Sequence, residues 1–360
     1  MRALRNAWYV AAWGDEITAS SLLGRTILNK PVLFFRDKSG KMAAIEDRCP
    51  HRFAPLSLGL HVGNAVQCGY HGLEFGTNGL CIRNPHDSGP LPPNAKVATY
   101  PVAEQFGAVW IWMGDEPADE SLIPQDFAFL GDPKLGHVKG YMHADANYVL
   151  MLDNLMDLSH ALYLHAGTLS TKEMRENFVP QARMVGDVVA CEREQPGIAP
   201  PGQWAAILGP EVKKVDFYSH VFWHSPSAVI HPFGCRMPGK PQSVDGGASS
   251  ISGHFFTPET ESTTHYFFHN TRDYQVDSAD MDANIQNLLE RVFSTQDIPM
   301  IEAQQRVIGD VDLDTLRPVV LRTDRATVLM RRHLAKQIKN EESSESVRES
   351  QLAPAEAGTG

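Results

Sequence analysis

Two short sequences in the N-terminal third of the chain each place a cysteine close to a histidine. The first holds Cys49 and His51, and the second, separated from it by sixteen residues, holds Cys68 and His71. Thiolates and neutral imidazoles are the ligands of zinc and of several iron centres. This pattern constrains the fold more than any other feature, because both loops must meet around one metal centre.

Two kinds of centre accept this ligand set. One is a tetrahedral structural zinc site with two cysteines and two histidines. The other is a [2Fe-2S] cluster in which two thiolates hold one iron and two imidazoles hold the other. Zinc fingers usually place their cysteines as one pair and their histidines as another, whereas here each loop carries one of each. The mixed loops favour the iron-sulfur cluster, and Pro50, Gly69 and Gly72 fit the tight turns that such loops need.

A second polar group lies about ninety residues further on, in the segment from Asn154 to His165. Asp157 and His160 are three residues apart and share one face of a helix. His165 lies about 140° further around a regular helix, so the helix must widen by a π-type turn or end between the two histidines. Two histidines and one carboxylate with open positions form the ligand set of non-heme Fe(II) oxygenases. Two buried structural histidines are the alternative.

The missing carboxylate is expected from a later helix. Glu290, Asp297 and Glu302 are the candidates in the segment 288–302. Asp297 has a simpler possible role as a helix N-cap before Pro299, and Glu302 suits a solvated surface position. The residue pattern alone leaves this choice open.

Composition and charge limit the function classes. A chain of 360 residues with 42% hydrophobic residues suggests two domains, and a net charge of −11 argues against nucleic acid as a partner. The remaining cysteines, Cys81, Cys191 and Cys235, are scattered and are expected to be small buried hydrophobic residues. Without a disulfide framework, a secretion signal or a membrane-length apolar segment, we expect a cytoplasmic protein with no membrane partner.

The chain divides into three predicted parts. Residues 1–117 form a β-rich domain, residues 118–338 form a second domain, and the acidic residues 339–360, which contain no aromatic side chain, form a disordered tail. The predicted strands of the first domain are Trp8–Trp13, Arg25–Leu28, Val32–Arg36, Met42–Asp47 and Ala108–Met113. In the second domain we expect helices at 145–165, 279–306 and 313–338, with mainly strands at 171–275. Residues 195–210, rich in Pro and Gly, form either a mobile lid or a plain surface loop.

Both motifs resemble those of the Rieske oxygenases. Respiratory Rieske proteins carry a second cysteine in each loop, and neither loop of this chain has one. The segments 6–11, 50–57, 70–75 and 153–160 most resemble the O-demethylase branch, which includes vanillate and dicamba demethylases. The resemblance covers about residues 3–335 and both metal motifs. It implies an α+β fold: an all-β Rieske domain followed by a helix-grip (START-like) catalytic domain whose antiparallel sheet lines the substrate pocket.

The resemblance also assigns roles to residues. It implies that mononuclear Fe(II) is held by His160, His165 and Asp297. Asp157 is expected to hydrogen-bond both an iron-bound histidine and a cluster histidine of a neighbouring subunit, and Asn154 is a second catalytic candidate. Two histidines that the sequence places among apolar strand residues, His231 and His254, are the expected substrate contacts, with structural core histidines as the alternative.

The implied activity is that of a terminal Rieske monooxygenase. It uses O2 and two electrons to hydroxylate the methyl group of a methoxy-aromatic acid, which gives a phenol and formaldehyde. Alternatives are a ring-hydroxylating dioxygenase, an N-dealkylating or methyl-hydroxylating oxygenase on another aromatic compound, and a Rieske-type electron-transfer protein. The chain has no G-x-G-x-x-G sequence after a strand, so a separate NAD(P)H-dependent reductase, with or without a ferredoxin, is expected to deliver electrons. The resemblance also implies a homotrimer in which His71 faces a neighbour's Asp157, because family members with a single oxygenase chain assemble in this way.

Overall fold

The N-terminal part of the molecule is built from three small antiparallel sheets. The computed structural model describes residues 2–86, 88–166, 169–176, 180–240 and 247–352. The strand orders are β1-β11-β10, β2-β3-β4-β9 and β5-β6-β7-β8. Their bounds are β1 Trp8–Trp13, β2 Leu23–Ile27, β3 Lys30–Arg36, β4 Met42–Glu46, β5 Leu60–His61, β6 Ala65–Gln67, β7 Glu74–Gly76, β8 Cys81–Arg83, β9 Thr99–Tyr100, β10 Val102–Gln105 and β11 Ala108–Trp112. Each predicted strand of this part is present, with ends shifted by at most two residues.

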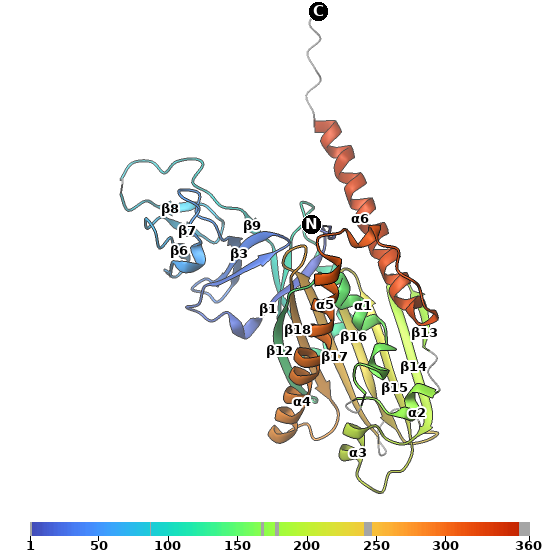
Figure 1. Cartoon of the computed structure of the whole chain (residues 1–360). Helices are drawn as coiled ribbons and strands as arrows, with labels where there is room; N and C mark the ends of the chain where they lie inside the picture. The colour runs from blue at the N-terminus through green and yellow to red at the C-terminus, as the bar shows by residue number, and fades with distance from the viewer. Residues whose placement is uncertain (1, 87, 167–168, 177–179, 241–246, 353–360) are drawn as a thin grey trace, which may run out of the picture.

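A seven-stranded antiparallel sheet dominates the C-terminal part (Figure 1). Its strand order is β12-β18-β17-β16-β15-β14-β13. The bounds are β12 Gly136–Ala144, β13 Gln181–Val185, β14 Val188–Ile198, β15 Val215–His224, β16 Ala228–Arg236, β17 Ala248–Pro258 and β18 Thr264–Arg272. This sheet and the all-β N-terminal part confirm the expected α+β class.

The described residues form six α-helices and one π-helical turn. They are α1 Tyr148–Met156, α2 Lys172–Glu176, α3 Gly202–Leu208, α4 Ala279–Val292, α5 Ile298–Ile308 and α6 Arg325–Leu352, with a π-helical turn at Phe293–Asp297 between α4 and α5. Short 3-10 turns occupy Gly14–Glu16, Leu56–Leu58, Glu120–Leu122, Gln125–Gly131, His160–Leu162, Leu313–Thr315 and Arg322–Asp324.

The two faces of the large sheet have different partners. One face packs against α1, α5 and α6, and side chains such as Leu152, Ile301 and Met330 join strand residues in one core. The other face packs against β1 and β11 of the N-terminal part, where Trp13 and Trp110 contact Phe255 edge to face. Figure 1 shows the helices gathered on one side of the sheet. Buried apolar side chains on both faces therefore hold the sheet between the helices on one side and the N-terminal strands on the other.

The helix boundaries differ from three expectations. The first predicted helix, 145–165, ends at Met156, and the second, 279–306, is interrupted by the π-helical turn. The third does not begin at residue 313 but at Arg325, and it continues to Leu352.

The expectation that disorder starts at residue 339 is therefore wrong for 339–352. The carboxylate of Glu341 accepts hydrogen bonds from the backbone N–H groups of Arg5, at 2.8 Å, and Asn6, at 2.6 Å, which ties this end of α6 to the N-terminus. Residues 353–360 lie outside the described part of the chain. The predicted boundary between residues 117 and 118 stays a prediction.

Candidate metal centres and substrate cavity

The two cysteine–histidine loops have the same backbone hydrogen bonds. The N–H of Cys49 donates to the carbonyl of Ala54 at 2.9 Å, and the N–H of Cys68 donates to the carbonyl of Leu73 at 2.8 Å. The N–H groups four residues after each cysteine, in Phe53 and Gly72, return to the cysteine carbonyls at 2.8 Å and 3.0 Å. Both of these residues have a positive φ, 60° and 74°, which tight turns of this shape require.

The side chains of these loops fit a [2Fe-2S] cluster. Cys49 and Cys68 are buried at the inner end, and the rings of His51 and His71 lie 4.5 Å apart, centre to centre, nearer the surface. Burial, with the neighbouring Cys68, raises the pKa of the Cys49 thiol to about 11. His71 Nδ1 is buried without a hydrogen-bond partner in the described part of the chain. A cluster with one thiolate-bound and one imidazole-bound iron would use all four groups.

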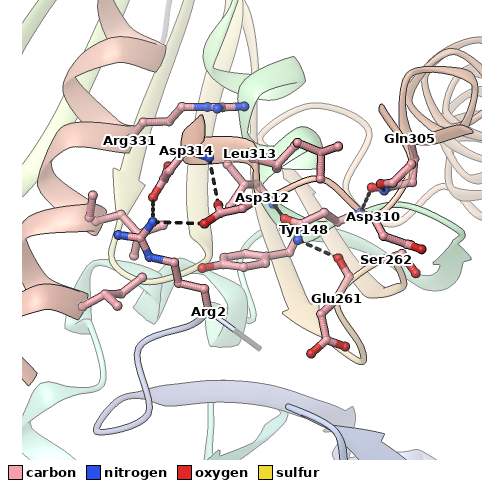
Figure 2. A pocket seen from close by; sticks show the side chains of 17 residues that line it. Arg2, Tyr148, Glu261, Ser262, Gln305, Asp310, Asp312, Leu313, Asp314 and Arg331 are labelled. Carbon is pink, nitrogen blue, oxygen red and sulfur yellow. Dashed lines mark hydrogen bonds and ion pairs between the residues drawn. The ribbon is translucent and has the colours of Figure 1, made fainter. Parts of the chain in front are cut away.

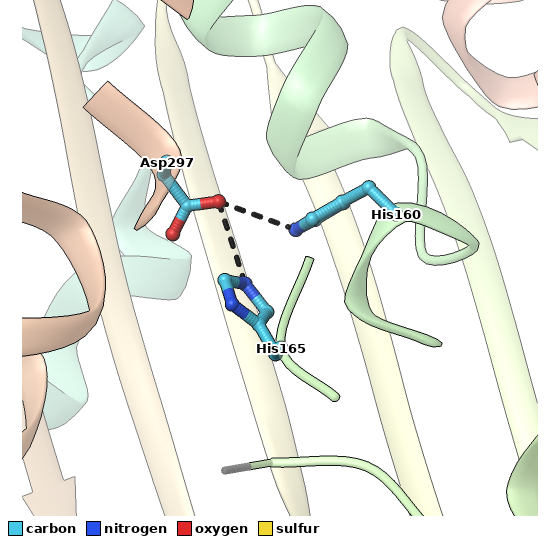
Figure 3. A group of neighbouring side chains, drawn as sticks. All are labelled: His160, His165 and Asp297. Carbon is cyan, nitrogen blue, oxygen red and sulfur yellow. Dashed lines mark ion pairs between the residues drawn. The ribbon is translucent and has the colours of Figure 1, made fainter. Parts of the chain in front are cut away.

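The second polar group also converges. Figure 3 shows His160, His165 and Asp297 pointing toward one another. The Nε2 atoms of His160 and His165 lie 3.5 Å and 3.4 Å from Asp297 Oδ1, and the three ligand atoms lie within 4.8 Å of one another. Helix α1 ends at Met156, before both histidines, so the chain reaches them through a 3-10 turn and loop. The expected widening or helix end between the two histidines is therefore not observed, because the helix already ends before His160.

A π-helical turn is present instead in the segment that carries the carboxylate, Asp297. Asp297 is the last residue of that turn and is only 2% exposed. It does not cap α5, since its side chain makes no N-cap hydrogen bond. The other two candidates are elsewhere: Glu290 is exposed and accepts from Gln286, and Glu302 accepts from the N–H of Asp145 at 3.1 Å.

Hydrogen bonds to the far side of each ring orient the histidines. His165 Nδ1 lies 2.7 Å from Gln296 Oε1, and His160 Nδ1 hydrogen-bonds the backbone carbonyl of Asp157. Each ring then carries its proton on Nδ1 and offers Nε2 as a ligand. Asn154 Nδ2 donates to Asp297 Oδ1 at 3.2 Å. Gln296 was not anticipated from the sequence, where only its place beside Asp297 could have pointed to it.

The electrostatics of the group suit a cation. Burial lowers the pKa of His160 despite the opposing charge of Asp297. At His165 burial also opposes the charged form, but hydrogen bonding and charge from Asp297 outweigh it and raise the pKa. A buried carboxylate facing two imidazole nitrogens is the donor set of non-heme iron.

Asp157 differs from its expected contact. Its backbone carbonyl, rather than its carboxylate, bonds His160. Its Oδ1 accepts from Ser159, from the N–H at 2.8 Å and from Oγ at 2.6 Å. The side chain is half-buried and does not join the three converging ligand atoms.

A cavity of about 370 Å³ adjoins the converging histidines. His160, His165, Asp297 and Asn154 form part of its wall, and strands β14 to β18 with helices α3 and α4 supply most of the remainder. Most of the wall is apolar. Four residues of α3 also line it, so part of the segment 195–210, predicted as lid or loop, belongs to the cavity wall: Gln203, Trp204, Ala206 and Ile207.

His231 and His254, the expected substrate contacts, both line this cavity. His231 Nε2 lies 3.0 Å from Ser219 Oγ, and His254 Nδ1 lies 2.8 Å from the hydroxyl of Tyr266. Burial, with the nearby His220 and His160 rings, lowers the pKa of His231 to about 3. Burial lowers the pKa of His254 well below its usual range. Both rings therefore favour the neutral form at physiological pH.

A larger pocket, of about 540 Å³, lies away from the metal ligands (Figure 2). It is formed by the start of α1, the segment 309–314 and α6, and Figure 2 shows Tyr148, Arg2 and Asp314 in its wall. None of the residues of the two metal groups lines it. Pocket volume alone therefore does not identify the catalytic site.

The fold and both sites define a class of protein. A β-domain with a mixed cysteine–histidine cluster site, joined to a domain with two histidines and a carboxylate beside an apolar cavity, is a Rieske non-heme iron oxygenase. In the described part of the chain, every helix is too short or too polar to span a bilayer.

Comparison with known families agrees with this class. The Rieske [2Fe-2S] domain family matches residues 7–101, and the vanillate O-demethylase oxygenase C-terminal domain family matches residues 144–340. The chain belongs to the vanillate O-demethylase family of Rieske oxygenases, with a [2Fe-2S] cluster and mononuclear iron as its cofactors.

Similar proteins cover nearly the whole chain. The oxygenase component of dicamba O-demethylase from Stenotrophomonas maltophilia is 38% identical over 338 residues, 93% of this chain and 98% of that protein. The oxygenase component of chloroacetanilide N-alkylformylase from Rhizorhabdus wittichii is 36% identical over 351 residues, 94% of this chain and 96% of that protein. The crystal structure of dicamba monooxygenase bound to dicamba has a TM-score of 0.87 at 36% identity, covering 95% of this chain and all of that chain.

Proposed function

We propose that this chain is the terminal oxygenase of a multicomponent monooxygenase that removes the methyl group of a methoxy-aromatic acid. One atom of O2 enters a methyl C–H bond, and the other leaves as water with two electrons and two protons. The hemiacetal that results breaks its C–O bond to give a phenol and formaldehyde. The oxygenase class is established by the family, and the substrate is the proposal.

One observation carries the proposal. The converging atoms of His160, His165 and Asp297 border an apolar cavity that suits an aromatic ring. A substrate methyl group at that side of the cavity would face the metal ligands. When bound, the cluster supplies single electrons and the iron activates dioxygen.

The protein's own residues divide the remaining tasks. Asn154 holds the Asp297 carboxylate, while Gln296 and the backbone of Asp157 hold the two imidazoles. His231 and His254 offer neutral polar contacts to the substrate inside the cavity. We assign the cluster to Cys49, His51, Cys68 and His71, and the iron to His160, His165 and Asp297.

Electrons are proposed to arrive from a separate reductase, with or without a ferredoxin. The names of the similar proteins, which are oxygenase components or subunits, support this. We also propose a homotrimer with head-to-tail contacts, in which the half-exposed carboxylate of Asp157 bonds His71 of the next subunit. Its placement in the cytoplasm remains part of the proposal.

N-dealkylation is the second candidate. It is favoured by the 36% identity to the chloroacetanilide N-alkylformylase component over nearly the whole chain. The same hydroxylation, placed on a carbon attached to nitrogen, would release an aldehyde and an amine. Ring dihydroxylation and electron transfer without catalysis have no such support.

The test is product analysis. The oxygenase, a reductase and NADH are incubated with methoxybenzoates, and oxygen uptake, formaldehyde and phenol are measured. We expect one O2 consumed and one formaldehyde released per phenol. A cis-diol that retains the methyl group and both oxygen atoms would overturn the proposal while leaving both iron sites intact. Formaldehyde from N-methyl substrates alone would favour the second candidate.

A further inference from the structure

A row of side chains crosses the large sheet along one wall of the substrate cavity. Arg193 on β14 pairs with Ser219 on β15, which pairs with Phe233 on β16, which pairs with Ser250 on β17. Directly paired residues of antiparallel strands present their side chains on the same face. All four line the cavity. Arg193 therefore belongs to the cavity wall together with the residues on the neighbouring strands.

The guanidinium of Arg193 is buried and held in place. The residue is 3% exposed, and its charged group lies over the ring of Phe217, 5.5 Å from the ring centre. Its Nη2 donates to Gln195 Oε1 at 2.5 Å and reaches the carbonyl of Met174 at 3.5 Å. Burial lowers the pKa of Arg193 to about 10, so the side chain remains charged at neutral pH.

The charges of the wall are unequal. Among the described residues that line the cavity, Arg193 is the only lysine or arginine. Asp297 is the only acidic residue among them, and it belongs to the metal group. His231 and His254 are neutral. The cavity thus holds one fixed positive charge beyond the metal site.

The position of this charge relative to the metal ligands follows from the strand order. Ser219 contacts His231, whose pKa is affected by the His160 ring, and Arg193 lies one strand further from β16. Adjacent strands are about 4.8 Å apart. The backbone of Arg193 on β14 therefore lies about two strand spacings from β16, which carries His231, the strand residue near His160, and this offset suits a ring that carries a methoxy group and an anionic group.

We propose that Arg193 determines the specificity of this oxygenase by binding the acid group, a carboxylate or a sulfonate, of its aromatic substrate. The inference rests on the proposed function for the reacting methyl group. Placing an anion in an apolar cavity is costly unless a cation receives it, and a guanidinium binds planar carboxylates in a two-pronged geometry. Arg193 therefore makes the cavity selective for acids over neutral aromatic ethers.

The experiment measures binding without turnover. Calorimetry on the iron-loaded protein compares 3-methoxybenzoate and 3-methoxybenzenesulfonate with the neutral 3-methoxybenzamide. We expect whichever of the two acids binds more tightly to have a higher affinity than the amide. Arg193→Met should weaken the binding of that acid about tenfold to a hundredfold, the size of a lost charge-assisted hydrogen bond, and leave the amide nearly unchanged. Arg193→Lys should retain part of the preference. The relative losses for carboxylate and sulfonate identify the acid group.

The matched control is Arg236→Met. Arg236 is an arginine on the same sheet that bonds Glu194 at 3.0 Å, and it is not among the cavity-lining residues. This variant should bind all three compounds as the wild type does. Iron content and the melting temperature of each variant show whether it has folded.

The outcomes separate this inference from the proposed function. Equal loss of acid and amide in Arg193→Met, or no preference for acids in the wild type, would overturn the role of Arg193. Formaldehyde released from the amide but not from the acids would also do so, and would leave demethylation standing. Conversely, an acid bound through Arg193 whose ring rather than methyl group is oxidised would support this inference and end the proposal of demethylation.

Discussion

At the scale of single residues, we expect the three proposed iron ligands to act as a unit. His160→Ala removes one of three converging ligand atoms, while the cysteine–histidine loops lie in the other domain. We expect iron content to fall from about three atoms per chain to about two, because a cluster holds two irons and the mononuclear site one. Metal analysis and the visible absorption of the cluster measure the two sites separately.

The same preparation tests the cluster assignment. A colourless wild-type protein with stoichiometric zinc would contradict it. Loss of the cluster absorption together with the mononuclear iron in His160→Ala would mean that the two sites do not fold independently.

Gln296 offers a subtler test of the same site. Gln296→Leu keeps the size of the side chain but removes the partner of His165 Nδ1. We expect the affinity for mononuclear iron to fall about tenfold to a hundredfold, as when the hydrogen-bond partner of a ligand is lost. Competition with a chelator measures it. Gln286→Leu, on α4 and outside the cavity wall, is the control and should bind iron normally. Equal affinities in the wild type and Gln296→Leu would contradict the orienting role.

His231 makes stability depend on pH. Its pKa is about 3 in the folded protein against 6.5 for an ordinary histidine, so only the unfolded chain binds a proton between these values. This contribution to stability is present above pH 6.5 and is lost as the pH falls. The loss is about 2 kcal/mol at pH 5, at about 1.4 kcal/mol per pH unit. Urea unfolding at pH 7.5 and pH 5 should therefore show a smaller drop in the stability of His231→Gln than in that of the wild type, and an equal drop would contradict a neutral His231 ring in the folded protein.

Short motifs pointed to the cysteines and histidines of the loops and to His160 and His165, because their spacing within each segment is local. Asp297 lies far from the histidines in the sequence, and only the family resemblance selected it among three carboxylates. The roles of Gln296 and Arg193 could not be predicted, because neither residue belongs to a recognisable local motif. The pairing of Arg193 with Ser219 places Arg193 beside the cavity, and the register between two separate strands is not encoded in local residue spacing.

At the scale of elements, strands were predicted better than helices. Strand β1 has its predicted bounds, because alternating or continuous apolar runs between turns mark strands clearly. Helix α1 was predicted too long, since apolar periodicity continues through residues 157–165, where the chain leaves the helix to present His160 and His165. Helix α6 was predicted both to begin and to end too early, since its polar C-terminal part, which periodicity does not indicate, contacts the N-terminus through Glu341.

That contact gives a prediction for α6. Glu341→Ala removes a carboxylate that accepts from two backbone N–H groups. We expect the free energy of unfolding to fall by about 1–3 kcal/mol, because two donors lose their protein partner. Glu342→Ala, at the exposed neighbouring position, should change it little. Thermal or urea unfolding of the full chain compares the two, and equal effects would contradict the anchoring role of Glu341.

At the scale of the whole molecule, Asp157 tests the proposed assembly. Asp157→Asn preserves an acceptor for Ser159. It removes the negatively charged carboxylate that would accept a hydrogen bond from His71 of the next subunit. We expect both metals to remain and turnover to fall at least about tenfold. Asp145→Asn, at an exposed carboxylate, is the control.

The outcomes for Asp157→Asn have distinct meanings. Normal turnover would contradict an electron route between subunits through this residue. Loss of the mononuclear iron would instead make Asp157 a metal ligand. Sedimentation of the wild type measures whether the chain forms the proposed trimer.

Helices and loops on one side of the large sheet carry the iron ligands, whereas the strands carry His231, His254 and Arg193. In the proposed function, reactivity and selectivity thus reside on separate segments of the backbone. Side chains on the strands can be exchanged through evolution or by protein engineering without moving a metal ligand. One catalytic apparatus can in this way serve many substrates, and the inward-facing strand positions of this chain are the natural sites at which to redirect it.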